Sequence, residues 1–227
     1  MNTPTADYIR AYMPRRDPDP ARSALLLIDL QYASGSRQGA LGRKMKAEGS
    51  TVADYRFDRI ERSVVPNAVR MLSLFRRIGR PVLHVTVGAA TPDARDAPVH
   101  MRKLFSATEN YVGSHEHEIL AEVKPQPGEH VIRKTTIGAF ASTGIDSLLR
   151  ALDCEQLYLL GVSTNMCVET TAREAADRGY LVTLVEDGCG TTHADLHDST
   201  MRNFQRLFGR VCSTDAALEE LSGPVAR

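Results

Sequence analysis

Residues 157–187 decide the fold of this chain, and they read LYLLGVSTNMCVETTAREAADRGYLVTLVED. The segments Leu157–Gly161 and Leu181–Glu186 are mostly apolar, as is typical of strands that are buried on both faces. Between them, Val168–Arg178 has the apolar spacing of a helix, and Gly179 follows as a C-terminal cap. A strand, a helix and a second strand in this order predict two parallel strands joined by a right-handed crossover.

The same alternation of apolar and amphipathic segments extends over the chain after residue 20, without repeats or linkers. We therefore predict a single α/β domain, residues 1–227, with a three-layer Rossmann-like sandwich around a mostly parallel six-stranded sheet. The other strands are expected at Ala24–Leu30, Val82–Thr86, Val131–Arg133 and Arg210–Cys212, and the other helices at Val65–Ile78, Ile145–Leu152, Asp195–Leu207 and Ala216–Leu221.

Three segments fall outside this alternation. Residues 1–20 are expected to form an extended N-terminal arm. Tyr32–Arg62 and Gly88–Pro127 are polar, and we expect them to be long irregular excursions that serve as lids or subunit contacts. The basic residues of Ser36–Arg62 could steer an anionic substrate, or they could simply form a solvated loop or helix; they are Arg37, Arg43, Lys44, Lys46, Arg56 and Arg59.

The composition excludes several classes of protein. The chain has 227 residues and equal numbers of basic and acidic side chains, 28 of each, so it offers no excess positive charge for nucleic acid or an anionic membrane. The longest apolar run, Ala24–Ile28, is far shorter than the roughly 20 residues that span a bilayer. The proline-rich start lacks the apolar segment of a secretory signal. We therefore expect a cytoplasmic protein whose four cysteines are free thiols.

Candidate catalytic residues follow three of the predicted strands. Asp29 ends the first strand, Lys134 ends the third, and Cys167 lies between the fourth strand and the next helix. In a parallel sheet these ends meet at one edge, where ligands bind. Taken singly, each residue has an ordinary structural explanation, as a cap, a solvated charge or a packed thiol. Together they bring a carboxylate, an amine and a thiol to one place.

These groups suggest nucleophilic catalysis. The positive end of the helix dipole and a nearby ammonium would favour the thiolate of Cys167. The Asp29 carboxylate could take the thiol proton and later pass it to a leaving amine. An ion pair with Lys134 would keep Asp29 charged and oriented.

The motifs around these residues closely resemble those of the isochorismatase-like cysteine hydrolases. The resemblance lies in residues 160–180 with Val185-Glu186-Asp187, in Asp29-Leu30-Gln31, and in a lysine ahead of a small-residue and Phe loop, Lys134–Thr143. The motifs occur in the family's order, and the resemblance covers residues 23–221.

The resemblance implies a catalytic triad of Asp29, Lys134 and Cys167 and a thioester intermediate that water clears. It further implies an oxyanion hole made by the backbone amides of Met166 and Cys167, a cis peptide between Val162 and Ser163, and a homodimer or homotetramer. Around the small-molecule substrate we place Gln31 and Asn165 as polar contacts and Phe140 as an apolar wall.

The resemblance also narrows the reaction. Isochorismatases proper generally lack the cysteine, so Cys167 favours hydrolysis of a C–N bond in a small amide, ureido or carbamoyl compound, releasing ammonia or carbamate. Thr164-Asn165 resembles the ureidoacrylate, carbamoylsarcosine and biuret branch. Two alternatives remain open: vinyl-ether hydrolysis of an isochorismate-like acid, and a non-catalytic member that binds a ligand or senses redox state.

No cofactor or metal is expected. The Asp-x-His pattern of the metal-binding nicotinamidase branch is absent from residues 84–89, and no glycine-rich nucleotide motif follows a strand. Two histidine groupings could in principle coordinate zinc, His115-Glu116-His117 and His193-x-Asp195-x-His197. We interpret the second as a helix start.

Overall fold

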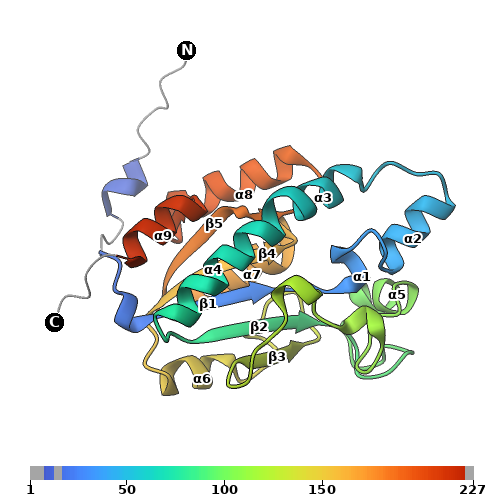
Figure 1. Cartoon of the computed structure of the whole chain (residues 1–227), viewed down its shortest axis with the longest axis horizontal. Coiled ribbons are helices and arrows are strands. Elements are labelled where there is room, and N and C mark those ends of the chain that lie inside the picture. The colour runs from blue at the N-terminus through green and yellow to red at the C-terminus, as the bar shows by residue number, and fades with distance from the viewer. Residues whose placement is uncertain (1–7, 13–16, 223–227) are drawn as a thin grey trace, which may run out of the picture.

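One parallel sheet organises the molecule. The computed structural model describes residues 8–12 and 17–222, and within them six strands form a single sheet in the order β3-β2-β1-β4-β5-β6, with every neighbouring pair parallel (Figure 1). The strands are β1 (Ser23–Ile28), β2 (Val82–Val87), β3 (His130–Lys134), β4 (Gln156–Val162), β5 (Leu181–Gly190) and β6 (Arg210–Cys212). The predicted α/β class and six-stranded sheet are confirmed.

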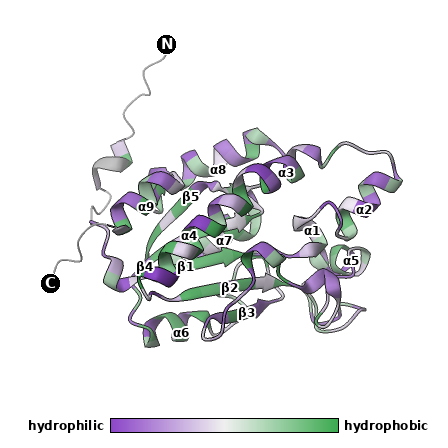
Figure 2. Ribbon diagram, in the orientation of Figure 1, coloured by the Kyte–Doolittle hydropathy of each residue, from purple (hydrophilic) through white to green (hydrophobic). Residues whose placement is uncertain are grey.

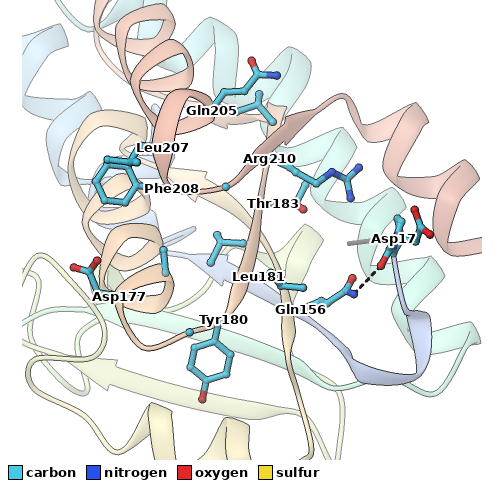
Figure 3. A pocket seen from close by; sticks show the side chains of 16 residues that line it. Asp17, Gln156, Asp177, Tyr180, Leu181, Thr183, Gln205, Leu207, Phe208 and Arg210 are labelled. Carbon is cyan, nitrogen blue, oxygen red and sulfur yellow. Dashed lines mark hydrogen bonds between the residues drawn. The ribbon is translucent and has the colours of Figure 1, made fainter. Parts of the chain in front are cut away.

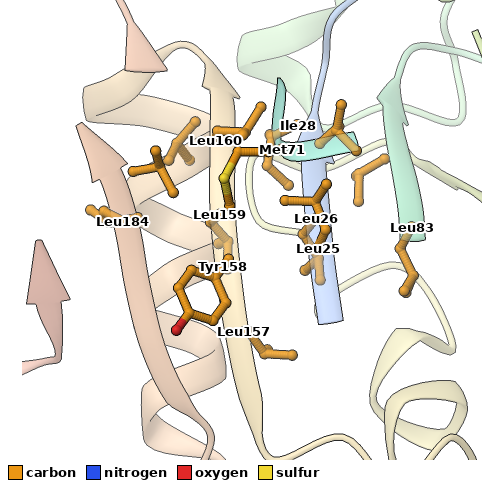
Figure 4. Packing of buried hydrophobic residues seen from close by; sticks show 14 of the residues in the cluster. Leu25, Leu26, Ile28, Met71, Leu83, Leu157, Tyr158, Leu159, Leu160 and Leu184 are labelled. Atoms are coloured by element: carbon orange, nitrogen blue, oxygen red, sulfur yellow. The ribbon is translucent and has the colours of Figure 1, made fainter. Parts of the chain in front are cut away.

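The strands lie where their apolar runs predict, and the central ones are buried along their whole length. Every residue of β1, β2 and β4 is buried, as expected for strands covered by helices on both faces. Side chains of β1 and β4 pack with Met71, which comes from a helix above the sheet (Figure 4). β3, at one edge, alternates between exposed and partly buried residues until Lys134, which is buried.

Helices cover both faces of the sheet. Helix α4 (Val65–Arg77) joins β1 to β2 and packs beside α9 (Thr214–Ser222). Helix α7 (Glu169–Asp177) joins β4 to β5 in the opposite direction along the sheet and contacts α8 (Ala194–Leu207). Because right-handed crossovers in opposite directions lie on opposite faces, these two pairs enclose the sheet. The strands are mostly apolar, whereas the helices carry both apolar and polar residues (Figure 2). Helix α6 (Ile145–Ala151) precedes β4.

The prediction of irregular excursions is wrong, because both contain helices. Residues 32–62 form α1 (Tyr32–Gly35), α2 (Ala40–Ala47) and α3 (Asp54–Arg59), and α3 continues through a π-helical turn, Ile60–Val64, into α4. The second excursion contains α5 (Val99–Ala107) and short 3-10 turns at His115–His117 and Ala121–Val123. Buried Ala53, Phe57, Ile60 and Val64 have helical spacing and extend the apolar stripe of α4 over the sheet.

The N-terminal arm is described only in part. Tyr8–Tyr12 and Pro20–Arg22 form 3-10 turns, so these parts of the arm are not extended, whereas residues 1–7 and 13–16 lie outside the described residues. In the described ranges no helix is both long and apolar enough to cross a bilayer.

Candidate active site

Three strand ends bring Asp29, Lys134 and Cys167 together. Asp29 directly follows β1 and has a left-handed backbone with φ of 53°, which is uncommon outside glycine. Its amide donates to the carbonyl of Val85 on β2 at 2.8 Å. Lys134 is the last residue of β3. Cys167 lies in a π-helical turn, Thr164–Val168, between β4 and α7. An unusual backbone at a residue that also carries a buried charge is typical of functional sites.

Lys134 and Asp29 form a buried ion pair. Nζ of Lys134 donates to Oδ2 of Asp29 at 3.0 Å and to the carbonyl of Thr136 at 3.1 Å. The exposed fractions of the lysine and aspartate side chains are 0% and 4%. The other aspartate oxygen, Oδ1, is buried and receives no hydrogen bond of ordinary geometry from the described residues, yet the Cys167 thiol lies close enough to interact with the carboxyl. Oδ1 is therefore the acceptor available to the thiol proton.

The three groups shift one another's protonation. Burial, and then the negative charge of Asp29, raise the pKa of Cys167 to about 12. Lys134 acts in the expected direction and lowers this pKa, but burial and Asp29 outweigh it, so a thiolate is not favoured in the resting protein. Burial also raises the pKa of Asp29, and Lys134 opposes this shift. Burial by itself lowers the pKa of Lys134, but the Asp29 carboxylate outweighs burial and the pKa lies above its usual value.

Backbone hydrogen bonds within the turn that carries Cys167, and a side-chain hydrogen bond to α8, stabilise the turn. The Ser163 carbonyl accepts the amides of Met166 at 3.0 Å and Val168 at 3.3 Å. The hydroxyl of Thr164 bonds to Nδ1 of His197 at 3.1 Å. The peptide between Val162 and Ser163 is cis, at the position where the resemblance implies one. Of the two amides expected to form the oxyanion hole, that of Met166 thus already has a partner within the turn.

The residues expected around the substrate have different surroundings. Oδ1 of Asn165 accepts from the Thr191 hydroxyl at 2.6 Å, and Asn165 lies two residues before the thiol. The Phe140 ring packs instead near the end of α7, 6.1 Å from the Tyr180 ring and under the guanidinium of Arg178 at 4.9 Å. Since Cys167 precedes the start of α7, the structure does not bring Phe140 to the thiol.

Gln31 is buried, and both the oxygen and the nitrogen of its side-chain amide form hydrogen bonds within the protein. Its oxygen accepts the Val87 amide at 2.8 Å, and its nitrogen donates to the His117 carbonyl at 2.9 Å. These bonds join the end of β1 to the end of β2 and to the turn at His117. The geometry therefore makes Gln31 a residue that holds the backbone next to Asp29.

The histidines of the possible zinc motifs do not form a set of metal ligands. His193 is exposed at the start of α8, whereas His197 is buried and bonds to Arg59 and Thr164. His115 pairs with Glu118, and Nδ1 of His117 bonds to Asn110 at 2.9 Å. Across residues 8–12 and 17–222, no group of three or more His, Cys, Asp or Glu side chains is placed to hold a metal ion.

The sequence singles out Arg56 only as one of six basic residues that could steer an anion, and it does not predict the place of Arg56 beside the reaction centre. Arg56 lies on α3 and is 5% exposed. Its Nη1 donates to the Ser163 hydroxyl at 2.6 Å, and its Nε donates to the Ser34 carbonyl at 2.9 Å. Its charge acts on both Asp29 and Cys167. The missed signal is helical spacing, since Arg56 is three residues after Ala53 and four before Ile60, both of which are buried.

Other basic residues of Ser36–Arg62 lie in ion pairs away from the Asp29, Lys134 and Cys167 cluster. Arg37 pairs with Asp54, Asp58 and Glu61, and Arg43 pairs with Glu116. Lys44 lies 4.0 Å from Glu48. These cations are balanced by carboxylates on the same or neighbouring helices, so they contribute little to a field that would steer an anion.

A cavity lies away from this cluster, at the amino ends of the strands. It has a volume of about 910 Å³ and is lined by Gln156 and Leu181, at the amino ends of β4 and β5, and by Phe208 and Arg210 beyond α8 (Figure 3). Ligands of parallel sheets bind at the carboxyl ends of strands, and the reactive groups are at that end here. We therefore assign the candidate active site from the Asp29, Lys134 and Cys167 cluster and not from cavity size.

The chain is similar in sequence to proteins of one known family. The family model described as "Isochorismatase domain" matches residues 23–216. The ureidoacrylate amidohydrolase RutB of Variovorax paradoxus (strain S110) is 30% identical over 206 residues, which cover 85% of this chain and 79% of that protein. The maleamate amidohydrolase of Pseudomonas putida is 28% identical over 159 residues, covering 70% of this chain and 75% of that protein.

A solved structure shares the fold. The crystal structure of a cysteine hydrolase from Pseudomonas syringae pv. phaseolicola 1448A superimposes with a TM-score of 0.76 at 22% identity, covering 91% of this chain and 95% of that one. Together with the family model, which spans most of the chain, these relatives establish that the protein belongs to the isochorismatase-like cysteine hydrolase family.

Proposed function

We propose that this protein is a cysteine-dependent amidohydrolase that cleaves a C–N bond of a small amide, ureido or carbamoyl compound. The observation that carries the proposal is the buried cluster in which Asp29 is held by Lys134 at 3.0 Å and interacts with the Cys167 thiol. A nucleophile, a base within its reach and a third group that orients the base are the requirements of covalent catalysis.

The first half-reaction uses Asp29 as a base and then as an acid. As the sulfur of Cys167 attacks the carbonyl carbon, the thiol proton passes to the carboxylate, because the pKa of the thiol is too high for a resting thiolate. The tetrahedral intermediate collapses by breaking the C–N bond. The protonated Asp29 gives its proton to the departing nitrogen, which leaves as ammonia or an amine, and an acyl or carbamoyl thioester remains on Cys167.

The second half-reaction reverses these roles. Asp29 takes a proton from water, the hydroxide adds to the thioester carbon, and the C–S bond breaks as the proton returns to sulfur. A carboxylic acid or carbamate is released and the thiol is restored. Throughout, the ammonium of Lys134 stays on Oδ2 of Asp29, which leaves Oδ1 to exchange the proton.

Backbone amides at the turn stabilise the oxyanion in this proposal. The amide of Cys167 is the principal donor, with that of Met166 sharing its hydrogen between the oxyanion and the Ser163 carbonyl that it already contacts at 3.0 Å. One such donor contributes about 3 to 4 kcal/mol to catalysis in other hydrolases.

The relatives support the reaction class. Two of them are named for amide hydrolysis, of ureidoacrylate and of maleamate. We propose the same class of reaction, amide hydrolysis, for this protein, but we do not assign it either of these two substrates.

The test is a panel of small amides, ureido acids and carbamoyl compounds assayed for ammonia release. The expected result is turnover of at least one compound, with a loss of more than ~10³-fold in Cys167→Ala. Cys212→Ala, which removes a thiol from the edge strand β6, is the matched control and should retain activity. Retained turnover in Cys167→Ala would refute the assignment of Cys167 as the nucleophile.

A further inference from the structure

Arg56 is a buried cation that contacts only neutral groups. Its hydrogen-bond partners are the Ser34 carbonyl at 2.9 Å, the Ser34 hydroxyl at 3.4 Å and the Ser163 hydroxyl at 2.6 Å. A guanidinium has five N–H groups, so at least two are left for another acceptor. Among the described residues Arg56 forms no ion pair with a carboxylate, although it is 5% exposed.

Two other arginines of the chain have the carboxylate partner that Arg56 lacks within residues 8–12 and 17–222. Arg76 bonds to Glu129 with two nitrogens, at 2.7 and 3.0 Å, and Arg173 pairs with Glu169 at 2.6 Å. Both are more exposed than Arg56 and still have a carboxylate partner. A charge taken out of water without an opposite charge is costly, and buried charges are normally paired, so the free N–H groups of Arg56 indicate a negative partner that the described part of the chain does not itself supply.

The position of Arg56 links it to the reaction centre. Ser34 lies on α1, shortly after Asp29, and Ser163 opens the turn that carries Cys167. Arg56 therefore joins the segment that follows the base to the segment that precedes the nucleophile. Burial lowers the pKa of Arg56 to about 10, and the Asp29 carboxylate, together with the Cys167 sulfur when it is ionised, only partly offsets that effect. The guanidinium remains charged at neutral pH.

We propose that Arg56 binds a carboxylate of the substrate, so that the enzyme acts on amide or ureido compounds that are also carboxylic acids. This inference rests on the proposed function and adds the substrate class. A planar guanidinium offers two parallel N–H groups to a carboxylate, which fixes the orientation of the acid as well as its affinity. With the carboxylate held at Arg56, the amide end of a short molecule is directed to Cys167.

The first test asks whether a negatively charged reagent reacts preferentially at Cys167, and it does not require any substrate to be turned over. Iodoacetate and iodoacetamide alkylate a thiol by the same displacement of iodide, but only iodoacetate carries a carboxylate. The ratio of their rates at Cys167, followed by peptide mass spectrometry, cancels any change in the amount of thiolate. We expect Arg56→Gln to lower the ratio of iodoacetate to iodoacetamide by 10- to 100-fold, the range expected for a charge-assisted hydrogen bond.

Two further variants make this result specific. Lys46→Gln removes a positive charge from an exposed position on α2 and should leave the ratio unchanged. Arg56→Lys keeps the charge without the planar fork, so its ratio should lie between those of the wild type and Arg56→Gln, and it serves where Arg56→Gln does not fold. An unchanged ratio in both Arg56 variants overturns the proposal.

The second test compares substrates. For an active amide acid and its methyl ester, Arg56→Gln should raise the KM of the acid by 10- to 100-fold and leave the KM of the ester nearly unchanged. If the wild type hydrolyses both equally well, the carboxylate site is refuted while the amidohydrolase proposal stands. If no compound is hydrolysed, the proposed function fails, and the alkylation ratio still decides whether Arg56 binds anions.

Discussion

Nζ of Lys134 lies 3.0 Å from Oδ2 of Asp29 although β2 separates the strands that carry them. Neighbouring strands are about 4.8 Å apart, so the backbones of β1 and β3 are roughly 9.6 Å apart, and the lysine stem, the hydrogen bond and the aspartate side chain together close this gap. Both groups are buried. Breaking a buried ion pair by removing one partner is costly, whereas removing both leaves no uncompensated charge.

Lys134→Met should therefore destabilise the protein by about 3 kcal/mol, because it leaves the Asp29 carboxylate unpaired. Asp29→Asn combined with Lys134→Met should recover most of that loss. Urea unfolding of the wild type, the two single variants and the double variant gives the coupling free energy. Simple addition of the two single losses would contradict the prediction, because residues in direct contact couple by about 0.5 to 3 kcal/mol.

The reactivity of Cys167 should follow its raised pKa. Below a pKa of about 12 the thiolate fraction increases tenfold with each pH unit, so alkylation by iodoacetamide should still be rising at pH 10. A plateau near pH 8 would instead indicate an activated thiolate in the resting protein.

Asp29→Asn should increase this alkylation rate while abolishing turnover. The substitution removes the negative charge that, after burial, raises the pKa of Cys167, so the thiolate fraction at a given pH increases. It also removes the proposed base, which should lower kcat by about 10²- to 10⁴-fold. A merely structural role for Asp29 predicts that alkylation and turnover change together, and this pair of measurements separates the two cases.

Glu129 should make the protein acid-sensitive. Burial works against its charged form, but the hydrogen bonds from Arg76, Gln126 and His84 outweigh burial and lower the pKa from 4.5 to about 2. This contribution is complete above pH 4.5 and is lost as the pH falls towards 2. Glu129→Gln should thus cost about 2 kcal/mol at pH 7 and much less at pH 2.5. Urea unfolding at both values measures the difference, with the exposed Glu122→Gln as control.

Gly161 should not tolerate a side chain. Its φ is 127°, and a Cβ atom would lie 2.1 Å from the Ile28 carbonyl oxygen on β1. Gly161→Ala should lower the free energy of unfolding by more than ~1 kcal/mol and should lower turnover, because the displaced backbone adjoins Asp29. Gly144→Ala is the control, since open space surrounds that position. Equal stability of the two variants would show that β1 and β4 can separate without cost.

The sequence predicts most accurately the strands that are long apolar runs and the helices that have a long apolar stripe. The strands β1, β2, β4 and β5 and the helices α4 and α8 lie within a few residues of their predicted bounds. The errors fall on α1, α2, α3 and α5, which are short helices within the segments predicted to be irregular. Their helical form depends on packing against the rest of the chain, and a single polar segment gives little sign of such packing.

The sequence by itself determined that Asp29, Lys134 and Cys167 share one edge of the sheet. Successive strands joined by helices must run parallel, and parallel strands end on the same side. The tertiary structure alone decided how these groups behave, because burial and neighbouring charges set the pKa of Cys167. It alone placed Arg56 beside the reaction centre, where its contacts at Ser34 and Ser163 are 22 and 107 residues away along the chain. Spacing along a sequence reports local periodicity, whereas charge balance at a buried site depends on residues that only folding brings together.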